Sequence, residues 1–230
     1  MDQLAEQREY YRHRAPEYDQ WWQRRGQYQL DDQAEANWFA DTREAQEALD
    51  AFNPSGDVLE YAAGTGWWTQ RLARHARHIT AVDASTETLE LNRARLDGAP
   101  ITYQQADIFT WSPPAAAFDV VFFSFWLSHV PDTLLSTFWG HVATALRPGG
   151  RVFLIDSYQP HRIDNDLQQR TLNDGRTFQV IKRYWQPDEL AALPGWHLQA
   201  AVTTHRCMLH AHGTRDLTAP ATPAPPAPPS

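Results

Sequence analysis

The chain has 230 residues, 42% hydrophobic and 21% charged, a composition that fits one folded α/β domain and excludes disorder over most of the length. Its formal net charge of -8 disfavours binding to nucleic acid or to an anionic membrane, because neutralising phosphates requires a basic face. No apolar run approaches the roughly 20 residues that cross a bilayer, and residues 1–15 are polar and charged, so we expect a cytoplasmic protein without a membrane partner.

The first 30 residues are rich in aromatic and arginine side chains, and Pro16 interrupts any long helix there. This composition predicts a helical arm or lid over residues 1–50, although an exposed partner-binding helix has the same signature. A helical apolar pattern from Trp38 to Phe52 ends at the turn-forming residues 53–56. A helix is therefore expected to lead into the core.

Residues 51–217 alternate apolar runs of strand length with helical patterns, which predicts βαβ units. The expected fold is α/β, a doubly wound and mostly parallel seven-stranded sheet that closes with two antiparallel strands at 196–202 and 206–212. The single cysteine, Cys207, cannot form an internal disulfide and is expected to fill the core within the last of these strands. The earlier expected elements are strand 58–61, helix 67–76, strand 79–82, helix 86–96, strands 101–104 and 120–124, helix 133–146 and strand 152–156.

Two segments stand apart from this pattern. The residues Asn173, Asp174 and Gly175 predict the turn of an inserted hairpin at about 170–185. Residues 218–230 are expected to form a disordered tail, because six of the last eleven residues are proline.

A nucleotide-type site is predicted at the first strand-to-helix junction, within residues 58–69. The small residues Ala62, Gly64 and Gly66 let a ligand approach the backbone, and the amide groups that begin the helix can donate to a carboxylate or a phosphate. Asp83 follows Gly66 by seventeen residues, at the end of the second strand, and is placed to accept hydrogen bonds from ribose hydroxyls. Together these features predict an adenosine-containing cofactor.

Bulky side chains decide against a dinucleotide cofactor. The G-x-G-x-x-G fingerprint needs a third small residue at the position of Thr69, which here follows Trp67 and Trp68. An NAD-linked oxidoreductase is therefore a disfavoured alternative. The Gly-Lys-Ser/Thr sequence of phosphate-binding loops does not occur in the chain.

Four landmarks in order resemble the class I S-adenosylmethionine (SAM)-dependent methyltransferases: Glu60 with the small residues to Gly66, Asp83, Asp107, and the run from Leu146 to Gly150. The resemblance covers roughly residues 55–157, with alanine at position 62 where many members carry glycine. It implies the Rossmann-like methyltransferase fold, SAM as cofactor and S-adenosylhomocysteine (SAH) as product. It also implies contacts of Glu60 with methionine, of Asp83 with ribose, and of Asp107 and Ile108 with adenine. The expected cofactor-binding residues are Tyr11, Tyr18, Glu60, Ala62, Gly64, Thr65, Gly66, Trp68, Asp83, Ala84, Asp107, Ile108 and Ser124.

Three flanking segments, residues 10–19, 122–131 and 170–182, resemble the phosphonate O-methyltransferases typified by that of dehydrophos biosynthesis. The resemblance then extends over most of residues 8–200 and departs at residues 21–40, which are richer in tryptophan and arginine. It implies methyl transfer to an oxygen of a small anionic metabolite, phosphonate-like or carboxylate-like, in secondary metabolism. The alternatives are O- or N-methylation of a neutral natural product, and binding of SAM without transfer.

The acceptor side is expected at the end of the fourth strand. Residues 124–127 differ there from the Asn/Asp-Pro-Pro-Tyr/Phe sequence typical of methyltransferases that act on nucleic-acid amines. His129 follows as a general base, a donor to an anionic acceptor, or a capping residue.

Arg170, Arg176 and Lys182 surround the expected hairpin. Lys182 is the only lysine of the chain, so it is either retained for its position or an ordinary surface residue. The three side chains could together cradle phosphonate or carboxylate oxygens. We expect His129, Arg170 and Lys182 to be catalytic, no metal site, and a monomer or a homodimer. The expected acceptor-binding residues are Tyr28, Trp126, His129, Arg170, Arg176 and Lys182.

Overall fold

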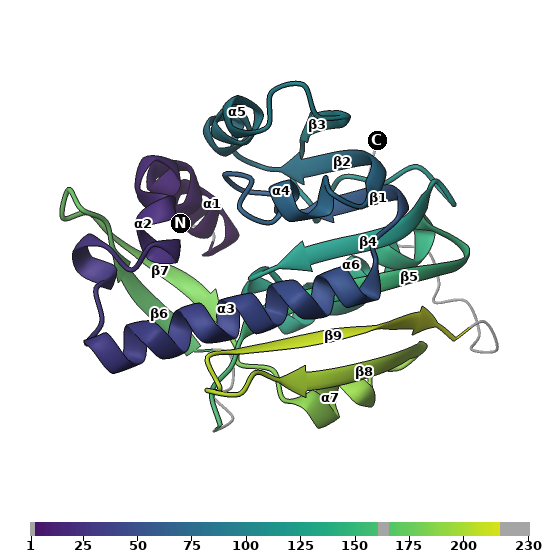
Figure 1. Ribbon diagram of the computed structural model, residues 1–230. Coiled ribbons are helices and arrows are strands. Elements are labelled where there is room, and N and C mark those ends of the chain that lie inside the picture. Colours follow the sequence, from purple (N-terminus) through teal and green to yellow (C-terminus); the bar gives the residue numbers. More distant parts are fainter. Residues whose placement is uncertain (1–2, 161–165, 217–230) are drawn as a thin grey trace.

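The computed structural model describes residues 3–160 and 166–216, so the predicted tail at 218–230 lies outside the described residues. Figure 1 shows the elements in place. In chain order they are α1 Gln3–Arg14, η1 Ala15–Glu17, α2 Tyr18–Trp22, η2 Gly26–Tyr28, α3 Asp32–Phe52, β1 Gly56–Tyr61, α4 Thr69–Leu72, β2 Ala76–Asp83, α5 Thr86–Arg95, β3 Ile101–Gln105, β4 Phe118–Ser124, η3 Leu127–His129, α6 Asp132–Ala145, β5 Leu146–Ser157, β6 Asp166–Thr171, β7 Thr177–Lys182, α7 Pro187–Ala191, β8 Trp196–Val202 and β9 Met208–Arg215.

The strands of the described chain form one seven-stranded sheet, in the order β3-β2-β1-β4-β5-β9-β8, and a separate hairpin of β6 and β7. Neighbouring strands from β3 to β5 pair in parallel, whereas β9 pairs antiparallel with both β5 and β8. The predicted doubly wound, mostly parallel sheet is therefore confirmed. Its order reverses between β1 and β4, and ligands of open α/β sheets bind at such a point, outside the carboxyl ends of the strands.

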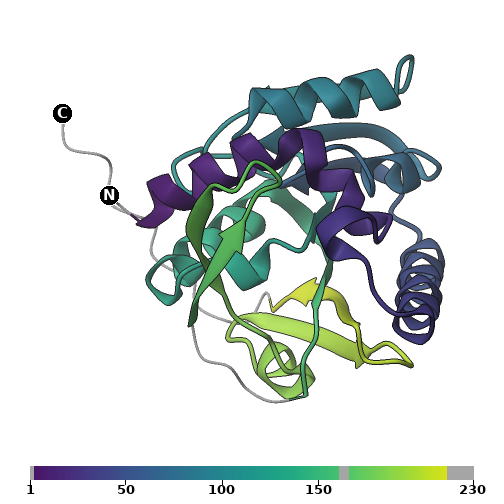
Figure 2. The ribbon, with the colours of Figure 1, turned by 90° about the vertical axis from the view of Figure 1, so that its left-hand side faces the viewer.

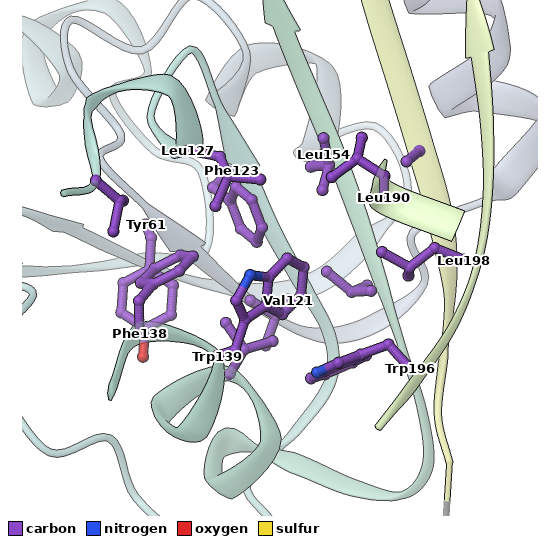
Figure 3. Close-up of a cluster of buried hydrophobic side chains, with 14 of the residues drawn as sticks. Tyr61, Val121, Phe123, Leu127, Phe138, Trp139, Leu154, Leu190, Trp196 and Leu198 are labelled. Carbon is purple, nitrogen blue, oxygen red and sulfur yellow. The ribbon is translucent and has the colours of Figure 1, made fainter. Parts of the chain in front are cut away.

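Both faces of the sheet are covered by helices. Val58 and Leu59 of β1 are fully buried in different hydrophobic clusters, because successive side chains of a strand point to opposite faces. On one face, α3 buries Leu49 against β5 and β9. On the other, Trp139 of α6 packs with Phe123 and with Trp196 of β8, as Figure 3 shows.

The N-terminal segment divides into two parts. Helix α1 ends at Arg14, just before Pro16, and lies beside the β6–β7 hairpin, where Tyr10 packs against Leu172 and Val180 (Figures 1 and 2). Helix α3 begins after Asp31, whose carboxylate accepts from the Ala34 amide at 2.9 Å, an N-cap contact. The expected domain boundary at residue 50 falls inside α3, which packs on the sheet as part of the core.

Two details of the sequence prediction are corrected. The helix expected over 67–76 is a single turn, Thr69–Leu72, because β2 already begins at Ala76. Cys207 does not lie in a strand: the turn before β9, with Arg206 at φ 65°, leaves it half-buried ahead of Met208. Among the helices the structure describes, none has the length and apolar character needed to cross a bilayer.

Candidate active site

A cavity opens beyond the carboxyl ends of β1, β2 and β4. Its empty space is about 820 Å³ including the open mouth. We call it the cofactor cavity. It brings together residues that are far apart in sequence, from α1 to the segment after β4. The predicted cofactor residues that line it are Tyr11, Tyr18, Ala62, Gly64, Asp83, Ala84, Asp107, Ile108 and Ser124.

Asp83 is held rigidly at the wall of the cofactor cavity. Its Oδ2 accepts from the Gly64 amide at 2.9 Å, and its Oδ1 accepts from the Ser85 amide at 3.0 Å. Burial raises the pKa of Asp83, and these two amide donors act in the opposite direction. The loop facing it turns through left-handed conformations at Ala62 (φ 52°) and Gly64 (φ 53°), which explains why many family members carry glycine at position 62.

Asp107 connects the cofactor cavity to the N-terminal helix. Its Oδ2 accepts from the Arg8 guanidinium at 2.7 Å, and its Oδ1 accepts from the Phe109 amide at 3.0 Å. Arg8 lies on α1 and lines the same cavity. Helix α1 therefore closes one side of this cavity, as a lid would.

A second cavity adjoins the first, and Tyr11, Tyr18 and Phe125 line both. Its empty space is about 1290 Å³ including the open mouth. We call it the acceptor cavity. No aspartate or glutamate is among its described lining residues, although the chain carries a net charge of -8. The basic residues that line it are Arg14, Arg24, Arg170 and Lys182.

Lys182 lines the acceptor cavity and is only 4% exposed. The alternative that Lys182 is an ordinary surface residue is therefore wrong. Its Nζ donates to the hydroxyls of Ser128 at 2.8 Å and Ser157 at 3.1 Å, and lies 3.4 Å from Asp156 Oδ1. Burial lowers the pKa of Lys182, and the charge of Asp156 opposes this shift. The ammonium is thus fixed in direction by groups of η3 and of the end of β5.

His129 is fixed in one tautomer by its neighbours. Its Nδ1 lies 2.6 Å from the Ile181 carbonyl oxygen, which can only accept, so Nδ1 carries the proton and donates. Nε2 is then the acceptor for the Tyr11 hydroxyl, at 2.8 Å. Burial, followed by the charge of Lys182, lowers the pKa of His129 well below its usual value. The imidazole is therefore neutral near pH 7.

Two further arginines reach the acceptor cavity. Arg14 and Arg24 are 9% and 8% exposed, and the Nε of each is buried without a hydrogen-bond partner. Arg14 stacks on Tyr18 and Tyr28, with its guanidinium carbon 4.9 and 5.4 Å from the ring centroids. Neither arginine forms an ion pair with a described residue. Their charges are therefore available to a ligand.

Comparison with known proteins agrees with this geometry. Residues 58–150 match the model of a family described as a methyltransferase domain. The solved DhpI–SAH complex is 34% identical with a TM-score of 0.75, covering 94% of this chain and 98% of that chain. The chain belongs to the SAM-dependent methyltransferases. The DhpI–SAM–HEP complex is also 34% identical, with a TM-score of 0.77, and the match covers 91% of the methyltransferase and 96% of that chain.

A curated relative shares a shorter region with the methyltransferase. An uncharacterized methyltransferase of Mycobacterium tuberculosis (strain ATCC 25618 / H37Rv) is 35% identical over 114 residues. This match covers 49% of the present chain and 57% of the relative. The chain therefore spans little more than half the length of that curated relative.

The cofactor of the methyltransferase is SAM, and the cofactor cavity suits it. Asp83 presents a carboxylate that can accept from ribose hydroxyls, and its loop is free of large side chains at Ala62 and Gly64. The roles of Asp107 and Ile108 at the adenine remain predictions from the resemblance, and both residues line the cavity.

Four predicted cofactor residues do not line the cofactor cavity. Glu60 is 1% exposed inside β1, and burial raises its pKa to about 8. Thr65 donates to Asp19 Oδ1 at 2.7 Å. A Cβ at Gly66 would lie 2.7 Å from the Asn92 side chain, so glycine is needed there for packing against α5. Trp68 packs on Phe122 in the core.

The acceptor residues separate into three groups. Tyr28, His129, Arg170 and Lys182 line the acceptor cavity, as expected, whereas Trp126 lines the cofactor cavity. Arg176 is a correction: it lies past the hairpin turn, donates to Asp174 Oδ2 at 2.8 Å, and lines a separate surface pocket. The predicted three-residue cradle therefore lacks Arg176, because the hairpin turn carries it away from Arg170.

The residues of the site that the sequence did not predict include Arg8, Arg14, Arg24 and Phe125. Arg14 lies within residues 10–19, a segment that carried the resemblance, so a signal existed. Arg24 lies in the region that departs from the resemblance. No local pattern distinguished Arg8 from the other arginines, since its partner Asp107 is 99 residues away.

Proposed function

We propose that this methyltransferase transfers the methyl group of SAM to an oxygen of a small anionic metabolite of the phosphonate or carboxylate type. The supporting observation is the acceptor cavity, which adjoins the cofactor cavity and is lined by four basic side chains and no described acidic one. An excess of positive charge in one cavity of an acidic protein favours an anionic ligand.

Three side chains are suited to hold the acceptor oxygens. Arg170 and Arg14 offer guanidinium donors, which bind phosphonate and carboxylate oxygens through paired hydrogen bonds. Lys182 adds a point charge whose position is fixed by Ser128 and Ser157. These contacts would orient the acceptor and remove part of its hydration, which are the main contributions a protein makes to a group transfer.

The acceptor requires little acid–base assistance. Bound SAM supplies an electrophilic methyl group. A phosphonate oxygen is already largely ionised near neutrality, by analogy with the phosphate second pKa of about 6. Neutral His129 then acts by accepting from Tyr11, which fixes a tyrosine that lines both cavities.

A second candidate acceptor is a neutral alcohol or phenol. The neutral imidazole of His129, reached through the Tyr11 hydroxyl, favours it, because such an acceptor must lose a proton during transfer.

The test is incubation with methyl-labelled SAM and three acceptors of equal chain length: an alkylphosphonate, a carboxylate and an alcohol. We expect labelled methyl ester from an anionic acceptor. Arg170→Gln should lower kcat/KM for it about tenfold or more, as for loss of a hydrogen bond to a charged group. The matched control, Arg176→Gln, should have a kcat/KM within about twofold of the wild type, since Arg176 lies outside the acceptor cavity. Label found only in the alcohol would overturn the proposal.

A further inference from the structure

Arg24 is a buried cation that the proposed transfer does not use. Its guanidinium carbon lies 3.3 Å from the centroid of the Trp38 ring and 4.9 Å from that of Trp21. No described residue hydrogen-bonds or ion-pairs with this guanidinium, and Glu35 attracts it only from beyond ion-pair distance. Burial lowers the pKa of Arg24 to about 10, so it remains charged at neutral pH. A buried, unpaired charge is costly, and the cost falls when an anion binds.

The backbone directs Arg24 inward. It follows α2 in the left-handed conformation, at φ 51°, which residues other than glycine rarely adopt. Arg25, the next residue, is exposed. Residues with such strained backbone conformations are concentrated at binding and active sites.

Arg24 and the other basic residues occupy different parts of the acceptor cavity. Arg14, Arg170 and Lys182 all act electrostatically on His129. Arg24 instead lies over the rings of Trp38 and Trp21, whereas Lys182 is held by the hydroxyls of Ser128 and Ser157. The cavity thus has two basic positions, with aromatic rings of Trp21 and Tyr28 among its walls.

We propose that Arg24 binds a second anionic group of the methyl acceptor, so that the acceptor is a metabolite with two anionic groups joined by an apolar chain. This inference rests on the proposed function. The group that receives the methyl would lie with Arg170 and Lys182. The distal group, a carboxylate in its simplest form, would lie against Arg24 and the edges of the tryptophan rings.

The experiment compares ω-carboxyalkylphosphonates with two to five methylene groups against alkylphosphonates of the same length. For at least one length, the wild type should show a KM about tenfold lower for the carboxylated acceptor. Arg24→Gln should remove this preference, by raising KM more for the carboxylated acceptor than for the alkylphosphonate. Arg24→Lys, which keeps the charge, should retain part of the preference for the carboxylated acceptor. The control Arg25→Gln should behave as the wild type.

The outcomes separate the two proposals. No wild-type preference at any length would overturn the role of Arg24 and leave anionic methylation intact. An equal rise of KM for both acceptor series in Arg24→Gln would also overturn the role of Arg24. Such a rise is the effect expected of an arginine that supports the structure without binding the distal carboxylate. Should Arg24→Gln fail to fold, the wild-type preference and Arg24→Lys decide. Absence of methyl ester from every phosphonate and from the carboxylate would remove the proposed function, and this inference with it.

Discussion

We expect recognition of the cofactor to depend most on Asp83. Its two carboxylate oxygens are positioned by backbone amides of Gly64 and Ser85, so the side chain needs no rearrangement to meet a ribose. We expect Asp83→Asn to weaken SAH binding at least tenfold, since one acceptor of a charge-assisted pair is lost. Calorimetric titration measures this, with the exposed Asp97→Asn as control. Unchanged SAH affinity in Asp83→Asn would contradict the assignment.

Glu60 shows how a residue of the family pattern can act on stability. Burial raises its pKa to about 8, from 4.5, so the folded protein keeps a proton that the unfolded chain releases. The stabilising contribution is complete below about pH 4.5 and is lost as pH rises through about 8.

Glu60→Gln should therefore remove this pH dependence and stabilise the fold at pH 8 by about 1–3 kcal/mol. Urea unfolding between pH 5 and 8 measures the difference, with the exposed Glu90→Gln as control. Since Glu60 does not line the cofactor cavity, SAH affinity should change little. A large loss of affinity would instead support the methionine contact that the resemblance implies.

Among the elements, α1 has the most direct influence on the site. It carries Arg8 and Tyr11 into the cofactor cavity and packs against β7 of the hairpin. Gln7 fastens it at two points: its Nε2 donates to the His129 carbonyl at 3.1 Å, and its Oε1 accepts from the Ile181 amide at 3.0 Å. One buried side chain thus joins α1, η3 and the hairpin.

Gln7→Ala should loosen this helix, because it leaves two buried backbone groups unpaired at a cost of about 1–3 kcal/mol each. Hydrogen exchange of α1 should accelerate, and KM for SAM should rise severalfold. The exposed Gln3→Ala is the matched control. Equal exchange rates in Gln7→Ala and the wild type would show that α1 is held by its apolar contacts alone.

Across the whole molecule, acid stability should depend on buried and half-buried histidines that stay neutral in the folded chain. Burial lowers the pKa values of His129, His210 and His212, and His210 and His212 stack on Phe153 beneath α3. In the unfolded chain these histidines bind protons below about pH 6.5. In the folded chain they bind protons only at lower pH, because their pKa values are lowered. Stability should therefore be full above pH 6.5 and fall as pH drops toward the folded pKa values.

This acid sensitivity can be measured by urea unfolding at pH 7.5 and pH 5.5. His210→Gln should reduce the loss of unfolding free energy between pH 7.5 and pH 5.5. It also removes the stacking contact with Phe153, which lowers stability equally at both pH values. His197→Gln, at an exposed position of β8, should leave the loss unchanged. An identical loss in His210→Gln and the wild type would exclude His210 as a source.

Local patterns in the amino-acid sequence predict the sheet and the location of the cofactor site. An apolar run such as that of β1 indicates a strand buried on both faces of a sheet. The small residues that follow Tyr61 lie close to Asp83, because β1 and β2 are parallel neighbours and end at the same edge of the sheet. These are local signals, because strand identity and turn chemistry depend on near neighbours.

The acceptor cavity could not be predicted in the same way, because it forms where distant segments pack together. Arg14 and Arg24 from the N-terminal segment meet Arg170 and Lys182 from the hairpin there, and Arg176, six residues from Arg170, does not join them. Sequence distance gives no measure of such meetings, since a hairpin turn separates near residues while α1 packing brings together residues more than a hundred positions apart. The neutral state of His129 was likewise beyond the sequence, because it follows from burial and from Ile181, 52 residues away.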